Sequence, residues 1–361
     1  MIDQSTEGGG GQASGSRVLL GLSGGVDSMA SAILLEAQGY DVTAVTLWTW
    51  QEDMQDQSRL ERARNSARRL GIPHRILDVR QAFYDRVITP FVDDWKQGLT
   101  PNPCVMCNPE FKFRTMKDLA DELDCQYLAT GHYARLSRTD AGSRLMRAAH
   151  HYQDQSYFLY RLPAALLDRL LFPVGTRSKD QVRQLAGQYG DPVADVRDSQ
   201  DLCFIGKNQL KDFLFRQGVE SGPGSFVDVS DQVIGQHSGS WQFTIGQRRH
   251  LGQSFGRRMT VLAIDHQRNR VTLGEEEEAF TQRMWLTDLV FPADPPDTMS
   301  CLVQLRSQGK PLEVSVTINR DRAEATLEFQ EPARITSPGQ SAVFYDGDLV
   351  LGGGIVSRVQ P

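Results

Sequence analysis

Cysteine is scarce in this chain, and its number argues against a secreted protein held together by disulfides. The 361 residues contain five cysteines, Cys104, Cys107, Cys125, Cys203 and Cys301. Disulfide frameworks belong to small secreted domains, usually with an even number of cysteines. We therefore expect reduced thiols, with Cys125 and Cys301 as small buried core residues. Any disulfide should be transient and part of a reaction.

Long apolar runs and net positive charge are also missing. The sequence contains no run of about 18 apolar residues, the length needed to cross a bilayer. Residues 1–16 are polar and lack the apolar core of a signal peptide. We expect a disordered tail over 1–16 and a cytoplasmic protein with no membrane partner. The net charge of −6 disfavours indiscriminate nucleic-acid binding, although it leaves room for a local basic surface.

Two groups of arginines are candidates for such a surface. The acidic run 275–278 offsets the second group, and either group could equally be an ordinary solvated face. The groups are Arg135, Arg138, Arg144 and Arg147, and Arg248, Arg249, Arg257 and Arg258.

The order of apolar and amphipathic segments predicts the fold class. Strands are predicted at 17–22, 41–47, 74–79 and 126–130, and helices at 26–38, 58–70, 81–97 and 110–123. This alternation is typical of an α/β fold with a doubly wound parallel sheet. After Ile205 short strands and turn residues take over, and from about Trp285 alternating strands predict a β-barrel. We therefore expect a catalytic α/β domain over 17–207, a small central β-rich domain over 208–280 and a C-terminal β-barrel over 281–361.

The first strand runs directly into a glycine- and serine-rich turn and then into a helix. Glycines there allow positive φ and close backbone approach, serines add hydroxyl donors, and the helix start offers N–H groups to an anion. No P-loop lysine follows, so the turn is not a Walker A motif. Ligands of such sheets lie beyond the carboxyl ends of the strands, and an ordinary Gly-rich turn is the alternative. The nucleotide-binding candidates are Gly21, Leu22, Ser23, Gly24, Gly25, Val26, Asp27 and Ser28, with Leu47 and Gly131 at the ends of other strands.

Two cysteine-bearing segments carry the second signal. Cys104 and Cys107 lie in a proline-stiffened loop, 100–108, just before a predicted helix, and Cys203 lies in the polar segment 198–205. A helix N-terminus favours the thiolate, which a nucleophile needs. The Cys-x-x-Cys spacing also fits half a zinc site, a redox pair or, with Cys203, three ligands of an iron–sulfur cluster. No second Cys-x-x-Cys or histidine pair completes a zinc set.

Together these segments resemble the tRNA-specific 2-thiouridylases, members of the PP-loop ATP pyrophosphatase superfamily. The likeness extends over nearly the whole chain, through segments at 129–133, 154–159, 172–175, 203–206, 243–248 and 338–345. It implies an ATP-dependent sulfurtransferase that replaces the C2 oxygen of the tRNA wobble uridine by sulfur and releases AMP and pyrophosphate. ATP is then a substrate, Mg²⁺ is expected with it, and no bound redox cofactor is expected.

The resemblance also implies roles for individual residues. Cys203 would carry a persulfide delivered by a cysteine desulfurase or a sulfur-relay protein, and Cys107 would be the second catalytic thiol. The segment 21–28 would bind ATP. The tRNA, expected to be an acceptor of Lys, Glu or Gln, would be contacted by Asn102, Pro103, Cys104, His132, Gln153, Asp154, Gln155, Arg306, Ser307 and Gln340.

Three positions leave their roles open. Many family members carry an acid–base aspartate where this chain has Cys104, so either this thiol moves protons or the loop only positions the uridine through Asn102 and Pro103. Gln153 replaces a lysine, which removes one charge from an expected tRNA contact. Asp27 could touch a metal–phosphate assembly or simply stabilise the first turn of its helix.

Other functions stay open at this stage. An iron–sulfur-dependent PP-loop tRNA thiolase would need the cluster. A PP-loop synthetase that adenylates a small molecule would need neither Cys107 nor Cys203. A non-enzymatic RNA-binding module would not convert ATP to AMP.

Overall fold

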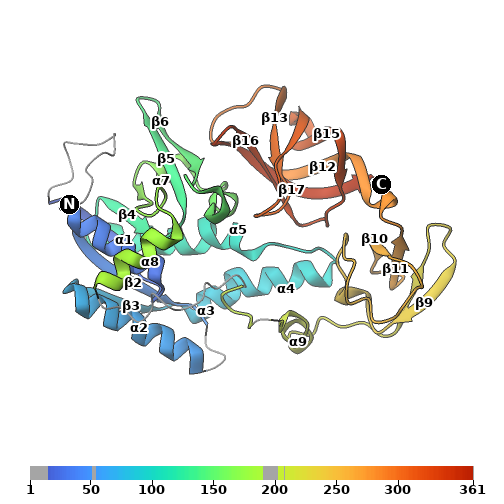
Figure 1. Cartoon of the computed structure of the whole chain (residues 1–361), viewed down its shortest axis with the longest axis horizontal. Coiled ribbons are helices and arrows are strands. Elements are labelled where there is room, and N and C mark those ends of the chain that lie inside the picture. Colours follow the sequence, from blue (N-terminus) through green and yellow to red (C-terminus); the bar gives the residue numbers. More distant parts are fainter. Residues whose placement is uncertain (1–14, 51–53, 190–201, 207, 361) are drawn as a thin grey trace. The chain divides into compact units, whose positions relative to one another are not determined.

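The computed structural model describes residues 15–50, 54–189, 202–206 and 208–360 (Figure 1). Nearly all of the expected tail and the stretch 198–201 before Cys203 lie outside the described residues. The chain forms two compact units, one of residues 1–84, 108–156 and 162–198, the other of 85–107, 157–161 and 199–361. The domain limits expected from the sequence stay a prediction.

A five-stranded parallel sheet forms the centre of the first unit. Its strands are all parallel and lie in the order β3-β2-β1-β4-β7. Successive strands are therefore added first on one side of β1 and then on the other, as in a doubly wound fold. Val18, Leu19 and Leu20 of β1 are wholly buried because both faces of the sheet are covered. The strands are β1 (Arg17–Gly21), β2 (Asp41–Trp48), β3 (His74–Asp78), β4 (Tyr127–Thr130) and β7 (Leu170–Leu171).

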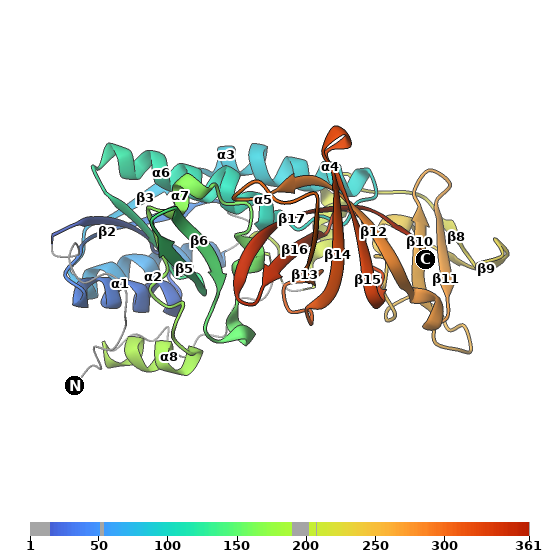
Figure 2. The same cartoon turned by 90° about the horizontal axis from the view of Figure 1, so that it is seen from above.

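Helices cover both faces of this sheet, and Figure 2 shows α1 (Val26–Ala37) and α6 (Phe113–Glu122) on opposite sides of it. The helix α8 (Lys179–Gln188) packs along α1 and starts with a Ser178–Gln181 capping box. The predicted strands and helices before residue 131 are confirmed, with the segment 81–97 formed by two α-helical pieces and a π-helical piece between them. The remaining elements are α2 (Met54–Leu70), α3 (Arg80–Phe83), η1 (Tyr84–Ile88), β5 (Ala134–Thr139), β6 (Gly142–Arg147), η3 (His151–Gln153), η4 (Ser156–Phe158) and α7 (Ala164–Leu167).

The cysteine-bearing segment 100–108 is largely helical, and the prediction of a loop there was wrong. The helix α5 (Pro103–Cys107) continues into η2 (Asn108–Lys112) and α6. Pro103 occupies the first helical position, where its missing N–H costs nothing. The Asn102 side chain accepts a hydrogen bond from the Cys104 N–H at 3.2 Å, so it caps the helix. Both cysteines therefore lie in the first turns of a helix.

The second unit contains α4 (Thr89–Lys96), α9 (Leu210–Arg216) and a small sheet in the order β10-β11-β8-β9. A core of Phe226, Phe243, Val261 and Leu273 fills one side of this sheet. The elements of this part are β8 (Gly224–Val227), β9 (Val233–His237), η6 (Ser240–Gln242), β10 (Thr260–Asp265), β11 (Arg270–Gly274) and η7 (Glu277–Ala279).

The C-terminal strands confirm the predicted barrel, which begins at residue 280. They run in the order β12-β15-β14-β13-β16-β17, and β12 pairs again with β17 to close the ring. Alternate residues of β14 face a core that includes Val314 and Val316. No helix within the described ranges is long and apolar enough to span a membrane. The strands are β12 (Phe280–Val290), β13 (Thr298–Gln304), β14 (Leu312–Asn319), β15 (Glu324–Arg334), β16 (Ser341–Asp346) and β17 (Leu349–Gln360), with η8 (Arg320–Arg322) between β14 and β15.

Candidate active site

The turn after β1 has the geometry of an anion cradle. The helix α1 begins at Val26, and its N-cap residue, Gly25, supplies no side-chain hydrogen bond to the first N–H groups. Those N–H groups and the positive end of the helix dipole are suited to a phosphate. The Ser28 hydroxyl accepts from the Ser23 N–H at 3.1 Å and donates to the Gly25 carbonyl at 2.9 Å. Ser28 is buried and holds the shape of the turn, while Ser23 is exposed.

Glycine is required at two positions around this cradle. Gly24 has φ +75°, and a Cβ there would lie 2.5 Å from the backbone oxygen of Arg59. Gly131 follows β4, and a Cβ there would lie 2.8 Å from the Asp27 carbonyl carbon. The first close approach lets the turn pack against α2, and the second lets the end of β4 pack against the start of α1.

The parallel register brings the other predicted nucleotide contacts to the same edge of the sheet. Gly21 is paired with Val45 of β2 and with Thr130 of β4. Leu47 lies two residues beyond Val45 and is half-buried. The turn, Leu47 and Gly131 therefore meet at the carboxyl edge, where doubly wound sheets bind ligands.

Asp27 is held by two side chains that the sequence did not reveal. Lys179 donates to both carboxylate oxygens at 2.8 and 2.9 Å, and the Tyr133 hydroxyl donates to one of them at 2.7 Å. The Lys179 side chain is only 11% exposed. Since 152 residues separate the ion pair, no local spacing predicts it. The arrangement places an ammonium group beside the cradle, on the side of the Asp27 carboxylate.

His132 is fixed at the end of β4. Its Nδ1 shares a hydrogen bond with the Thr130 hydroxyl at 2.7 Å, and its ring stacks on Phe113 and meets Phe172 edge-on. Burial, aided by the charge of Lys112, lowers the pKa of His132 well below its ordinary value. The imidazole is therefore neutral at physiological pH, as stacking on or bonding to a base would require.

The segment 153–155 is bound into the first unit. The Asp154 carboxylate accepts from Arg147, the Ala148 N–H and both donors of Ser156, at 2.8 to 3.1 Å. Gln155 accepts from the Tyr133 N–H at 2.9 Å. An RNA contact by Asp154 would therefore have to use its backbone. Gln153 lines a pocket of about 470 Å³ that also includes Lys179.

The first arginine group is largely structural. Arg147 is buried against Asp154 at 3.0 Å, Arg135 donates to the Arg147 carbonyl at 2.8 Å, and Arg138 donates to the carbonyls of Asp168 and Leu170. Three of its four guanidinium groups therefore hold the β5–β6 hairpin and its neighbours in place.

The thiols expected to do chemistry belong to the second unit. Cys104 and Cys107 are half-buried on α5, and Cys203 is exposed. The residue after it, Phe204, is buried, and its ring meets Phe91 of α4 and Phe213 of α9 edge-on at 5.6 and 5.5 Å. This aromatic contact anchors the turn that carries Cys203. Cys125 is buried, as expected, and Cys301 is half-buried with a pKa raised to about 12 by burial.

Gln340 links the barrel to the α5 segment. Its side-chain amide donates to the Thr100 carbonyl, and the Thr100 N–H donates to the Pro338 carbonyl at 2.9 Å. Gly339, at φ +91°, lies against Leu99 and Thr100, where a Cβ would be 3.1 Å from either. Arg306 is exposed and Ser307 half-exposed beyond β13. Within the described part of the chain, no three His, Cys, Asp or Glu side chains are arranged to hold a metal.

The fold and the site define a class of protein: a doubly wound α/β unit with an anion cradle at the carboxyl edge of its sheet, in one chain with a small β domain and a closed barrel. Residues 16–207 match the tRNA methyl transferase HUP domain, residues 211–275 the tRNA methyl transferase PRC-barrel domain, and residues 281–356 the aminomethyltransferase beta-barrel domain.

Full-length relatives narrow this class. The chain is 42% identical to the tRNA-specific 2-thiouridylase MnmA of Acidithiobacillus ferrooxidans over 95% of its own length and 99% of that protein. It is 41% identical to the tRNA-specific 2-thiouridylase MnmA of Syntrophotalea carbinolica, over 94% and 98% of the two chains. The chain belongs to the tRNA-specific 2-thiouridylase family.

Proposed function

We propose that this protein is an ATP-dependent sulfurtransferase that converts the wobble uridine of tRNA to 2-thiouridine. The chain is similar over 94–95% of its length to named 2-thiouridylases. The observation that carries the proposal is that such a chain combines a PP-loop helix without a side-chain cap with an exposed Cys203 and with two thiols on α5. Each part matches one requirement of the chemistry.

The first step activates the uridine oxygen. O2 attacks the α-phosphorus of ATP, a P–O bond forms, and pyrophosphate leaves. The N–H groups at the start of α1 would bind the phosphates, because the pattern of donors there is open to an anion. Lys179 would add a positive charge where negative charge accumulates on the leaving pyrophosphate. Adenylation turns a poor leaving oxygen into AMP.

The second step moves the sulfur. The terminal sulfur of a Cys203 persulfide attacks C2, and AMP departs with the former O2. The Cys107 thiolate then attacks the Cys203 sulfur, so the sulfur–sulfur bond breaks and its electrons form the thiocarbonyl. The product is 2-thiouridine, with a Cys107–Cys203 disulfide. A dithiol reductant must reopen this disulfide before a cysteine desulfurase or relay protein reloads Cys203.

The residues fit ATP better than they fit a protein-bound metal. Both oxygens of Asp27 already accept from Lys179, so we assign no protein ligand to Mg²⁺. The ion would arrive on the phosphates of ATP, where it would neutralise charge. Cys104, next to the capped start of α5, would face the target base and stand in for the aspartate of other family members in proton transfer.

The recognition of tRNA divides between the two units. His132 and the segment 153–155 belong to the first unit, whereas Asn102, Pro103, Arg306, Ser307 and Gln340 belong to the second. We propose that they contact tRNAs for Lys, Glu and Gln. Extruding the wobble base from its loop requires a grip on the neighbouring backbone, which two separate groups of contacts would provide.

A single-turnover assay tests this proposal. The full chain, ATP, Mg²⁺, a persulfide source and unmodified tRNA are combined without oxygen, and 2-thiouridine and AMP are measured by mass spectrometry. We expect product with the wild type and none with Cys203→Ser or Cys107→Ser, while Cys301→Ser serves as the control and stays active.

Three outcomes of this assay would contradict the proposal. Formation of AMP without any 2-thiouridine, at the same rate in the wild type and in Cys203→Ser, would favour a synthetase acting on a small molecule. Activity proportional to bound iron would favour a cluster-dependent thiolase. Binding of tRNA without any AMP would favour an RNA-binding module. For Cys104, an active Cys104→Asp protein beside an inactive Cys104→Ala protein would support the proton-transfer role.

A further inference from the structure

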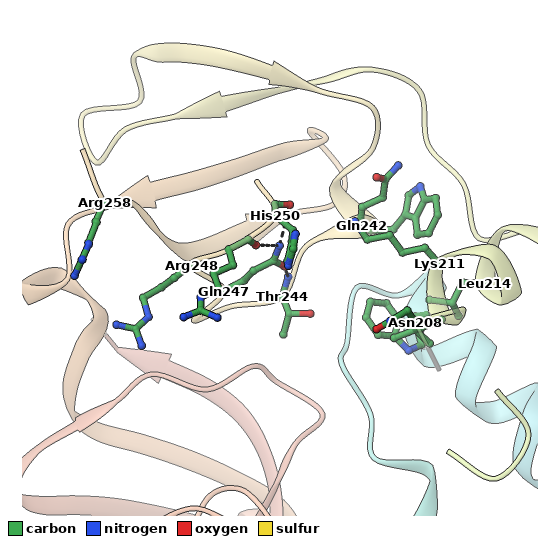
Figure 3. Close-up of a pocket in the computed structure, with 13 residues that line it drawn as sticks. Asn208, Lys211, Leu214, Gln242, Thr244, Gln247, Arg248, His250 and Arg258 are labelled. Atoms are coloured by element: carbon green, nitrogen blue, oxygen red, sulfur yellow. Dashed lines mark hydrogen bonds between the residues drawn. The ribbon is translucent and has the colours of Figure 1, made fainter. Parts of the chain in front are cut away.

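The second unit contains a pocket of about 1200 Å³ that the proposed chemistry does not use. Figure 3 shows Arg248 and Arg258 on one side of it and Lys211 and Leu214 of α9 on the other, with Thr244, Gln247 and His250 between them. The arginines belong to the second arginine group identified in the sequence. The pocket is large enough for several phosphodiester units.

The charged side chains that line this pocket are all cationic. None of its thirteen lining residues is acidic, and four are cationic. Arg248 is paired with Glu276 at 2.8 Å, but the side chains of Arg249 and Arg258 have no hydrogen-bond or ion-pair partner in the described part of the chain. Lys211 faces the ring of Phe243 at 5.7 Å, and burial lowers its pKa. Three cations thus line one pocket without a counter-ion among the residues that the structure describes.

A buried donor on the pocket wall also lacks an acceptor. Trp95 is 6% exposed and lines the pocket, and its indole N–H has no hydrogen-bond partner among the described residues. Leaving a buried donor unsatisfied costs about 1–3 kcal/mol.

The loop that carries the arginines is held in one shape. The Gln247 side chain accepts from the Thr244 N–H at 3.1 Å and donates to the carbonyls of Arg249 and His250 at 2.9 and 3.4 Å. His250 has φ +58°, a conformation that non-glycine residues adopt at a cost. Arg248 and Arg249 are therefore presented by a preorganised loop.

We propose that this pocket binds the phosphodiester backbone of the tRNA substrate, an inference that rests on the proposed function. Two contacts connect it with expected substrate groups. Arg306, an expected tRNA contact, lies against the same loop, since a Cβ on Gly246 would be 3.3 Å from its guanidinium. Phe213, on the helix that carries Lys211, packs against Phe204, the neighbour of Cys203. Backbone bound in the pocket thus lies on elements that hold the sulfur-carrying turn.

The test compares tRNA affinity at several salt concentrations for the full-length wild type, Lys211→Gln, Arg249→Gln and Arg258→Gln. The matched control is Arg257→Gln, because Arg257 neighbours Arg258 in sequence but is paired with Glu275 and does not line the pocket. Filter binding with unmodified tRNA transcript measures the dissociation constant, ATP affinity without tRNA reports on the PP-loop, and circular dichroism checks folding.

We expect each pocket variant to bind tRNA roughly fivefold more weakly near 0.15 M salt, and the slope of log K against log salt to fall by about 0.9 for each lost phosphate contact. ATP affinity and the Arg257→Gln protein should match the wild type. Unchanged tRNA affinity and slope in all three pocket variants would overturn the inference. Failure of the wild type to bind tRNA would instead overturn the proposed function.

Discussion

Asp27 shows how one side chain acquires its role from partners far along the chain. As the second residue of α1, a carboxylate would interact favourably with the helix dipole in any protein. In this protein Lys179 and Tyr133 also hold the Asp27 carboxylate by hydrogen bonds. The carboxylate orients the ammonium group beside the cradle. Lys179 therefore brings an ammonium group, paired with Asp27, to the first turn of α1, in a chain that has no P-loop lysine.

Replacing Lys179 should lower the rate of ATP cleavage far more than replacing a lysine in an exposed ion pair does. We expect Lys179→Met to lower kcat for pyrophosphate release on the order of 100-fold, as the loss of a group that stabilises developing charge does, with a smaller change in KM. Lys179→Arg should recover part of the rate. The control, Lys117→Met, removes a lysine from an exposed pair with Asp121 and should stay within twofold of the wild type. Equal effects of the two methionine variants would show that Lys179 has no special role.

Gly24 allows a test of backbone geometry alone. Gly24→Ala adds strain at φ +75° and brings its Cβ to 2.5 Å from the Arg59 carbonyl oxygen. The strain costs about 1–2 kcal/mol, and the clash should displace the cradle and abolish ATP binding. Gly71→Ala is matched, because Gly71 has φ +71° but nothing within 4 Å of a Cβ. Calorimetric titration with ATP should show loss of binding in the first variant and normal binding in the second.

At the scale of elements, α5 is where sequence and structure differ most. Pro101, Pro103 and the two cysteines of this segment suggested a loop, yet Pro103 suits the first position of a helix and Asn102 caps it. The capping signal was present in the sequence. It was outweighed because a five-residue helix has too little periodicity to be recognised, and because continuation into η2 and α6 depends on packing.

The hydrogen bond from Gln340 to Thr100 should control the mobility of this element. Gln340→Ala removes the donor, so the segment leading to α5 should open more often. We expect Cys107, now half-buried, to react with iodoacetamide a few times faster, with no change at the exposed Cys203. Peptide mass spectrometry over time measures both rates. An unchanged rate at Cys107 would mean that Gln340 serves the tRNA alone.

At the scale of the whole molecule, the anion cradle and the thiols proposed to react belong to different compact units. Four histidines, two in each unit, have a lowered pKa. Burial is the main cause that lowers the pKa of His74, His132, His237 and His266. Four of the seven histidines are therefore kept neutral by the fold.

This property predicts acid sensitivity. In the unfolded chain a histidine has a pKa of about 6.5, so as the pH falls below this value the unfolded state binds protons that the folded state does not. The contribution of these histidines to the free energy of unfolding is complete above about pH 6.5. It declines as the pH falls toward their pKa values in the folded protein, by at most about 1.4 kcal/mol per pH unit for each histidine. Thermal unfolding midpoints between pH 7.5 and 5 should fall steeply. His132→Asn should make the decline shallower, whereas the control His150→Asn, at an exposed position, should leave it unchanged.

The sequence by itself determined the local parts of this protein. Strand and helix periodicity set the doubly wound sheet and the barrel, and glycines followed by a helix start marked the cradle, because these features depend on neighbours in the chain. Tertiary structure alone decided the pairing of Asp27 with Lys179 and of Gln340 with Thr100, the burial of Asp154, and the gathering of Lys211, Arg249 and Arg258 around one pocket. The two pairings and the approach of Lys211 to the arginines join residues distant in sequence, and distance in sequence leaves no local pattern to read. Asp154 has partners two to seven residues away, which only the folded backbone gathers around its carboxylate.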